Sequence, residues 1–313
     1  MQTFTFRAAE DMEDVRIDKC LMLLMDSLSR TYIQKLIREG LVLVGTSPVK
    51  ANYKVKTDDL LQISVPDAVE PEILPEPIPL DILYEDDDLL IVNKPKGMVV
   101  HPAAGHYDGT LVNALLYYCH DSLSGINGIL RPGIVHRIDR DTTGSLLVCK
   151  NDFAHAQIAQ QLKDHSITRR YRAIVHGVIK EEDGTVDAPI GRSATDRKKM
   201  AVNHTNGKRA VTHYRVLERF REHTYIECEL ETGRTHQIRV HMASIAHPLL
   251  GDEVYAPGRK SGAAFGALVL QGQTLHAQVL GFVHPRSGAY IETFAPLPDY
   301  FTRLLETLRK RSG

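Results

Sequence analysis

The placement of proline is the strongest constraint on how this chain can fold. Five prolines fall within residues 65–81, VPDAVEPEILPEPIPLD. Proline fixes the backbone φ angle and removes an N–H donor, so this segment should be extended and semi-rigid. We therefore expect a linker at residues 67–80 between a small N-terminal domain, residues 1–66, and a large C-terminal domain, residues 81–313.

Charge is distributed unevenly between these parts. The net charge of all 313 residues is −1, and residues 1–66 hold nine basic and nine acidic side chains. Residues 67–88 contain nine acidic side chains and no Lys or Arg, which leaves 29 basic and 21 acidic side chains in residues 89–313. Because phosphate binding depends on a local basic face, the low total charge does not exclude a nucleic-acid substrate.

The N-terminal residues predict two helices and a small sheet. Ile17, Leu21 and Leu24 have helical spacing, and Ser29 can cap a second helix that Gly40 ends. Strands are expected at residues 41–44 and 55–65. The second helix carries basic residues away from its apolar stripe, at Arg30, Lys35 and Arg38.

The remaining residues predict an α+β domain with a mixed, largely antiparallel sheet and flanking helices, because strands outnumber helices and hairpin-length links dominate. Helices are expected at residues 153–162 and 299–311. Strands are expected at residues 171–175, 211–217, 225–230, 273–283 and 289–294.

Two polar segments contain candidate catalytic residues. HRIDRDTTG, residues 136–144, lies between apolar residues 133–135 and 146–148, so we expect a strand, a polar turn and a second strand. This turn offers Asp139 and Arg137 together. Taken alone, it is more typical of a hairpin with solvated charges.

The second segment is GRTHQIRVH, residues 233–241, which follows the predicted strand 225–230. Its apolar spacing predicts a helix, with Thr235 as the cap and Arg239 in the first turn. An arginine there opposes the helix dipole at a cost of a few tenths up to about 1 kcal/mol. An anionic partner facing Arg239 would explain its position.

These segments together resemble the RluA family of RNA pseudouridine synthases, in particular its RluD-like branch that acts on large-subunit ribosomal RNA. Four more segments match the family in order, at residues 84–102, 168–177, 247–258 and 273–277. The turn departs from the family's motif at two residues, with Ile138 in place of the usual leucine and Thr143 in place of the usual serine. Neither substitution changes a reacting group. The N-terminal residues resemble the S4 RNA-binding domain, with Gly45 and Thr46 where that family often has Asn-Gly.

The resemblance implies a pseudouridine synthase fold and the isomerisation of specific uridines in 23S ribosomal RNA or its large-subunit precursor. It assigns Asp139 as the catalytic carboxylate and Arg239 as its ion-pair partner. Tyr171 would stack on the target base and assist removal of the C5 proton, and Arg137 would fill the space that the flipped base leaves. The resemblance does not decide whether Asp139 attacks the base, attacks the ribose or abstracts a proton.

In the N-terminal helix, the resemblance favours phosphate contacts over a solvated face for Arg30, Lys35 and Arg38. The basic loops at residues 196–200 and 206–210 are either RNA contacts or solvated loops. If they bind RNA, the contacts are expected at Lys198, Lys199 and Lys208.

Three alternatives compete with this interpretation. A histidine-based metal site at His236, His241 and His247 is disfavoured, because residues five apart on a helix point about 140° apart and no H-E-x-x-H motif occurs. A phosphate-binding loop near Gly258 lacks the required glycine and lysine pattern. A non-catalytic RNA-binding or ribosome-assembly protein on the same scaffold remains the main alternative, and the presence of Asp139, Tyr171 and Arg239 favours an enzyme.

We expect no cofactor and no metal, because isomerisation gains no atoms. The four cysteines are scattered among apolar residues, which favours reduced thiols and a cytoplasmic location. The N-terminus resembles no signal peptide, and no apolar run is long enough to span a bilayer. We expect a monomer whose partner is ribosomal RNA, with no membrane contact.

Overall fold

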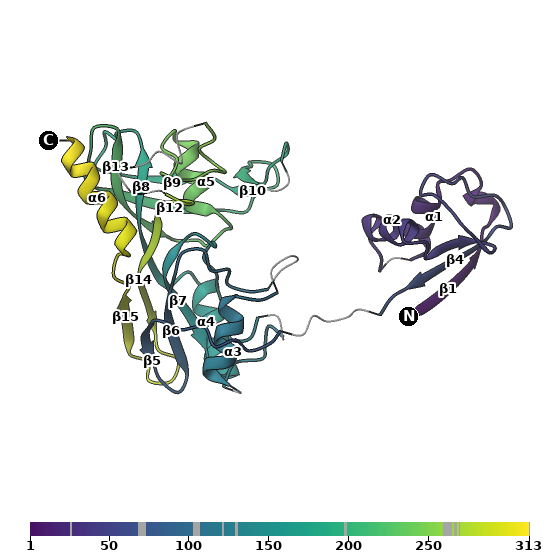
Figure 1. The fold of residues 1–313 in the computed structure, drawn as a ribbon, viewed down its shortest axis with the longest axis horizontal. Helices are drawn as coiled ribbons and strands as arrows, with labels where there is room; N and C mark the ends of the chain where they lie inside the picture. Colours follow the sequence, from purple (N-terminus) through teal and green to yellow (C-terminus); the bar gives the residue numbers. More distant parts are fainter. Residues whose placement is uncertain are drawn as a thin grey trace. The chain divides into compact units, whose positions relative to one another are not determined.

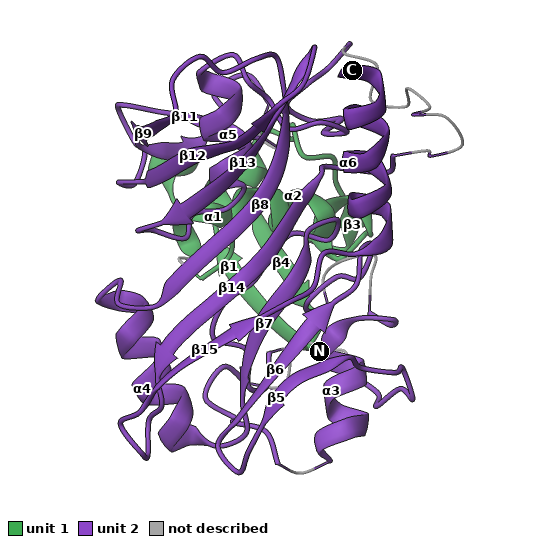
Figure 2. Cartoon of the chain, turned by 90° about the vertical axis from the view of Figure 1, so that its left-hand side faces the viewer, with its two compact units in different colours: residues 1–71 green, residues 72–313 purple. Residues whose placement is uncertain are grey.

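The computed structural model describes residues 1–25, 27–67, 73–102, 107–120, 122–128, 131–196, 199–258, 265, 268 and 270–312. The chain forms two compact units, Met1–Pro71 and Glu72–Gly313 (Figures 1 and 2). Lys198, one of the predicted RNA contacts, lies outside the described residues. Within the ranges given above, no helix has the length and apolar character needed to cross a membrane.

The smaller unit places two helices on a four-stranded antiparallel sheet. The sheet has the order β1-β4-β2-β3, formed by β1 (Gln2–Arg7), β4 (Leu60–Val65), β2 (Val42–Val44) and β3 (Ser47–Pro48). A 3-10 turn, η1 (Glu10–Met12), precedes α1 (Ile17–Leu24) and α2 (Arg30–Arg38). The Ser29 hydroxyl accepts a hydrogen bond from the Tyr32 N–H at 3.3 Å, so the predicted cap is confirmed.

The larger unit is built on a nine-stranded sheet. The strand order is β5-β6-β7-β14-β8-β13-β12-β9, and β15 also pairs with β14 (Figure 2). The strands are β5 (Ile82–Glu85), β6 (Leu89–Lys94), β7 (Thr143–Cys149), β8 (Thr168–His176), β9 (Asp183–Asp187), β12 (Val211–Arg219), β13 (His223–Leu230), β14 (Leu275–Val283) and β15 (Tyr290–Phe294). Among the named strands of this sheet, only β7 and β14 pair in parallel. The predicted mixed, largely antiparallel sheet is therefore confirmed.

Alternate strand residues bury both faces of this sheet. In β6, Leu89 and Ile91 join a core with α4 (Asp152–Lys163), whereas Leu90 and Val92 join a core with α3 (Leu111–Cys119) and α5 (Gln237–Ser244). The C-terminal helix α6 (Asp299–Ser312) packs against Ile174 of β8. A separate hairpin pairs β10 (Ile190–Arg192) with β11 (Met200–Val202).

One predicted strand is wrong. Residues 133–135 form only an isolated bridge, between Ile134 and Val148, and no regular strand. A side chain explains the difference: the Leu147 N–H donates to His136 Nε2 at 2.9 Å, so a histidine takes the place of a backbone acceptor. The segment before Asp139 is thereby fixed by a side chain.

The parallel pair β7–β14 depends on a glycine at the end of the HRIDRDTTG turn. Gly144 has φ +106°, and a Cβ atom there would lie 2.2 Å from the Ala277 carbonyl oxygen. Any side chain at residue 144 would therefore push β14 away from β7, in addition to its backbone strain.

We predict that Gly144→Ala lowers the free energy of unfolding by more than about 2 kcal/mol, because overpacking adds to the strain of positive φ. Gly288→Ala is the matched control, since Gly288 has φ +70° with no atom within 4 Å of its added Cβ. The control should cost about 1 kcal/mol. Calorimetric unfolding of both variants measures the difference, and equal transitions would contradict the close-approach explanation.

Candidate active site

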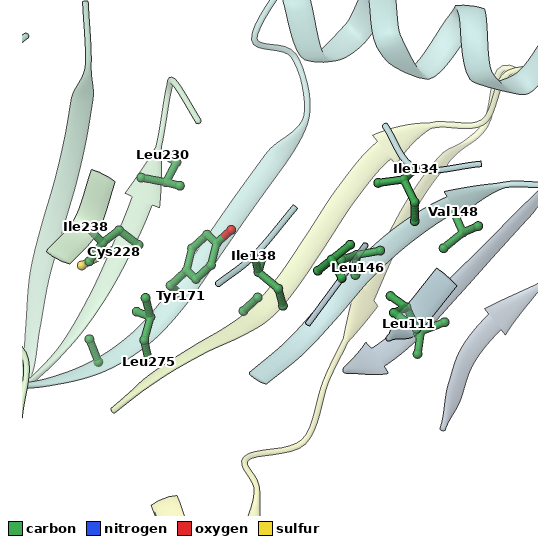
Figure 3. Packing of buried hydrophobic residues seen from close by; sticks show 14 of the residues in the cluster. Leu111, Ile134, Ile138, Leu146, Val148, Tyr171, Cys228, Leu230, Ile238 and Leu275 are labelled. Atoms are coloured by element: carbon green, nitrogen blue, oxygen red, sulfur yellow. The ribbon is translucent and has the colours of Figure 1, made fainter. Parts of the chain in front are cut away.

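A cavity of about 340 Å³ opens on the sheet face that carries α3 and α5. Its lining comes from the HRIDRDTTG turn, from β8 and from the start of α5. Figure 3 shows the Tyr171 ring beside Ile138 and Leu275, with Leu230 and Ile238 nearby. The cavity therefore has an apolar floor from several strands and a polar rim from two loops, as ligand sites commonly do.

A buried lysine fixes the backbone of the turn that contains Asp139. Lys94, at the end of β6, donates from Nζ to the carbonyl oxygens of Pro95, Met98 and Arg140 at 2.9, 2.8 and 2.9 Å. Burial lowers the pKa of Lys94 to about 7, against the opposing charges of Asp141 and Asp139. Because the Arg140 carbonyl is fixed, the backbone next to Asp139 has little freedom to move.

Arg239 joins two carboxylates that are far apart in the sequence. Its Nη1 donates to Asp139 Oδ2 at 2.8 Å. Its Nε and Nη2 donate to the two oxygens of Asp252 at 2.7 and 3.0 Å. The predicted anionic partner of Arg239 is thus two carboxylates, of which the bidentate one is Asp252.

The trio of Asp139, Arg239 and Asp252 is largely buried, so its ion pairs are little screened by solvent. The side chains of Asp252, Arg239 and Asp139 are 0, 7 and 17% exposed. Burial alone would lower the pKa of Arg239, but the hydrogen bonds and charges of Asp252 and Asp139 outweigh it and raise that pKa. Arg239 is therefore permanently charged, and the partly exposed Asp139 has an oxygen left free at the cavity.

The start of α5 differs from the prediction. Thr235 does not cap this helix; the N-cap is His236, which has φ 58° and ψ 22° and makes no side-chain cap. The Arg234 N–H is instead accepted by the Gln237 Oε1, at 3.0 Å. Arg239 does lie in the first helical turn, as predicted.

The other two predicted catalytic residues also line the cavity. Tyr171 is buried on β8, and burial raises the pKa of its phenol. Arg137 is exposed, two residues before Asp139. Arg169, which sequence reasoning missed, lies buried in the wall and donates to the Glu231 carbonyl at 3.1 Å.

Arginine and histidine dominate the ionisable groups around Asp139. They come from the turn, from α4–β8 and from the start of α5, and they are His136, Arg137, His165, Arg169, Arg234, His236 and Arg239. A cavity with one carboxylate and several cations favours an anionic ligand.

The predicted RNA contacts of the smaller unit differ in whether their charge is already paired within the unit. Arg30 pairs with the fully buried Asp18 at 2.8 Å, so part of its charge is used within the unit. Lys35 and Arg38 are exposed, and Lys35 lies 3.8 Å from Glu39. In the larger unit, Lys199 is half-buried and Lys208 is exposed.

The three histidines of the metal-site alternative each have protein partners. His241 bonds Thr212 and the Ala188 carbonyl, both at 2.9 Å. His247 bonds the His176 carbonyl at 2.9 Å, and His236 bonds Tyr255 at 2.8 Å. In the part of the chain that the structure describes, no three His, Cys, Asp or Glu side chains are grouped as metal ligands would be.

Comparison with known proteins agrees with this geometry. Residues 88–244 match the family model described as RNA pseudouridylate synthase, and residues 15–61 match the S4 domain. An RNA pseudouridine synthase of Bacillus subtilis (strain 168), named as uncharacterized, is 53% identical over 310 residues and covers 99% of both chains. Ribosomal large subunit pseudouridine synthase D of Zymomonas mobilis is 49% identical over 312 residues and covers 98% of both.

A solved structure shows the same relationship. Human RNA Pseudouridylate Synthase Domain Containing 1 superposes with a TM-score of 0.57 at 26% identity, over 77% of this chain and 98% of the human one. The resemblance expected from the sequence is confirmed: this chain belongs to the RNA pseudouridine synthase family and carries an N-terminal S4 domain.

Proposed function

We propose that this enzyme isomerises specific uridines in large-subunit ribosomal RNA, 23S RNA or its precursor, with Asp139 as the reacting carboxylate. The observation that carries the proposal is the arrangement of Asp139: it faces the cavity, and one oxygen is held by Arg239. Relatives named ribosomal large subunit pseudouridine synthase D support the substrate class.

The reaction conserves all atoms. The bond between N1 and the ribose C1′ breaks, the base turns, and C5 bonds to C1′; C5 loses its proton and N1 ends protonated. Both nucleophilic attack and proton abstraction by Asp139 require its ionised form at the cavity. Arg239 places a permanent positive charge 2.8 Å from one oxygen of that carboxylate.

The cavity wall suits a nucleotide extruded from its stack. Tyr171 offers an aromatic ring against which a flipped base can stack. Its raised pKa keeps the phenol protonated near neutral pH, so removal of the C5 proton by Tyr171 would need an additional activating contact in the complex. Arg137, exposed at the rim, is placed to occupy the gap left in the RNA.

We assign RNA backbone binding to the S4 domain, with Lys35 and Arg38 as its main phosphate contacts and Arg30 in a partly structural role. Lys198, Lys199 and Lys208 are proposed as further contacts of the catalytic domain. We place the domain boundaries at residues 1–66, 67–80 and 81–313.

We further propose a monomer that acts in the cytoplasm. The four cysteines are free and buried, which suits a reducing compartment.

We predict that Asp139→Asn abolishes pseudouridine formation while the fold and RNA affinity persist, because amide and carboxylate are nearly isosteric. Asp141→Asn is the matched control: it makes the same change two residues away, at a side chain outside the cavity lining. Turnover is measured as the release of a hydrogen isotope from C5 of the substrate uridine. Turnover by Asp139→Asn above the no-enzyme background would reject Asp139 as the reacting carboxylate, whereas no turnover by the unaltered protein would favour a non-catalytic RNA-binding protein.

We predict that Arg239→Ala loses turnover and about 3–5 kcal/mol of stability, since it leaves two carboxylates without a buried partner. Arg239→Lys should recover only part of both properties, because lysine lacks the planar fork. Urea unfolding and single-turnover kinetics are the measurements, and a fully active lysine variant would contradict the bridging role.

We predict that the double change Lys35→Glu/Arg38→Glu weakens binding to long ribosomal RNA. It should also flatten the plot of the logarithm of the binding constant against the logarithm of the salt concentration. For single-stranded RNA, the slope should change by about 0.7 for each phosphate contact that is lost. Lys50→Glu/Lys54→Glu, an equal charge change on exposed residues of the same unit, is the control. The single-turnover rate at saturating RNA should stay unchanged. Equal slopes for both variants in a filter-binding salt series would rule out α2 as the phosphate-binding helix.

A further inference from the structure

His236 has a backbone conformation that needs an explanation. It is the residue before α5, and its φ of 58° lies in the left-handed region. This conformation costs a non-glycine residue of the order of 1–3 kcal/mol and persists where the surroundings impose it. The conformation directs the imidazole into the wall of the cavity, where the side chain is 23% exposed.

Tyr255 fixes the orientation of this imidazole. The Tyr255 hydroxyl lies 2.8 Å from His236 Nδ1, and the two rings meet edge to face with centroids 5.7 Å apart. The same Tyr255 ring lies 5.0 Å from the Arg239 guanidinium carbon. Tyr255 is held in turn by Asp252, whose Oδ1 accepts the Tyr255 N–H at 3.1 Å.

The hydrogen bonds of Tyr255 also select the tautomer of His236. The Tyr255 oxygen accepts the Met200 N–H at 3.1 Å, which leaves the hydroxyl proton to be donated to His236 Nδ1. A neutral imidazole that accepts at Nδ1 carries its proton on Nε2. Burial, opposed by the charge of Asp139, lowers the pKa of His236 and favours this neutral form.

The proton-bearing nitrogen faces the free oxygen of Asp139. His236 Nε2 lies 3.8 Å from Asp139 Oδ1, while Arg239 occupies Oδ2. This separation is longer than a hydrogen bond. Contacts of this kind are commonly long in the free enzyme and shorten when substrate is bound.

We propose that His236 is a positioning residue for Asp139, which presents Nε2–H to Oδ1 in the RNA-bound state, and that Tyr255 holds it in the required tautomer. The inference rests on the proposed role of Asp139. Arg239 on one oxygen and His236 on the other then fix the carboxylate plane, and Oδ1 keeps a second lone pair toward the extruded nucleotide.

The test compares amides that place their N–H₂ group differently. The amide nitrogen of glutamine can take the place of Nε2, so His236→Gln keeps a donor toward Asp139. Asparagine reaches only the position of Nδ1, and it tolerates the left-handed conformation. His120→Asn is the control, because His120 also has positive φ, at 49°, and lies outside the cavity lining.

We expect His236→Asn to lower the single-turnover rate at saturating RNA by about 10- to 100-fold, as misplacement of a reacting group does, with RNA affinity unchanged. His236→Gln should recover at least part of this loss, and His120→Asn should match the unaltered enzyme. A wild-type rate for His236→Asn, or equal losses for the asparagine and glutamine variants, would overturn the inference.

Nitrogen NMR of histidine-labelled protein provides a second readout. His236 should be the Nε2–H tautomer in the full-length protein, and Tyr255→Phe should shift it toward a mixture while it keeps the ring contacts. An Nδ1–H tautomer in the unaltered protein would also overturn the inference. If Asp139→Asn is inactive and His236→Asn is fully active, this inference alone fails; an active Asp139→Asn rejects the proposed function itself.

Discussion

The site depends on one cation shared between two carboxylates. Arg239 contacts Asp252 through two nitrogens and Asp139 through the third, and little of the trio is exposed. The buried Asp252, the partly exposed Asp139 and one guanidinium give the trio a net charge of −1. Asp139 carries that excess charge at the cavity, because Asp252 is fully buried and has both oxygens bound to Arg239. The anionic charge needed for the reaction is thus directed to one oxygen by the geometry of its neighbours.

The rest of the larger unit brings these groups together. Asp139 lies in a turn fixed by Lys94 at the end of β6 and by the close approach of β7 and β14 at Gly144. Arg239 lies on a short helix whose apolar side chains, such as Ile238 and Met242, enter the same core as β7 and β8. A sheet buried on both faces allows little relative movement of its strands. The positions of the charged groups are therefore set by the packing of the sheet.

Much of the fold could be predicted from local patterns. The Ser29 cap and the alternating strands β8, β12 and β13 follow from side chains and their near neighbours. The parallel pairing of β7 and β14 could not be predicted, because it joins segments about 130 residues apart with no local signal. The strand expected at residues 133–135 failed because His136 satisfies the Leu147 N–H instead.

Part of the site could also be predicted, but from the family resemblance and not from local patterns. The pairing of Arg239 with Asp139 followed from the family resemblance, and the structure brings these residues within 2.8 Å. Asp252 and Tyr255 were missed as individual residues, because they lie in an irregular turn where no periodicity singles them out. The only signal was the unexplained arginine in the first turn of α5, which called for an anionic partner. The left-handed backbone of His236 has no sequence signature, since glycine is the usual residue there.

The most direct test of Asp139 as the reacting carboxylate is a structure of the enzyme bound to a ribosomal RNA fragment that carries 5-fluorouridine at the modified position. Fluorine at C5 prevents the loss of the C5 proton, so the complex should halt with the nucleotide in place. We expect this nucleotide to be extruded into the cavity, to stack on Tyr171 and to meet Asp139 at the oxygen that Arg239 leaves free. A target nucleotide bound elsewhere, or one that enters the cavity while Asp139 is turned away, would contradict the assignment.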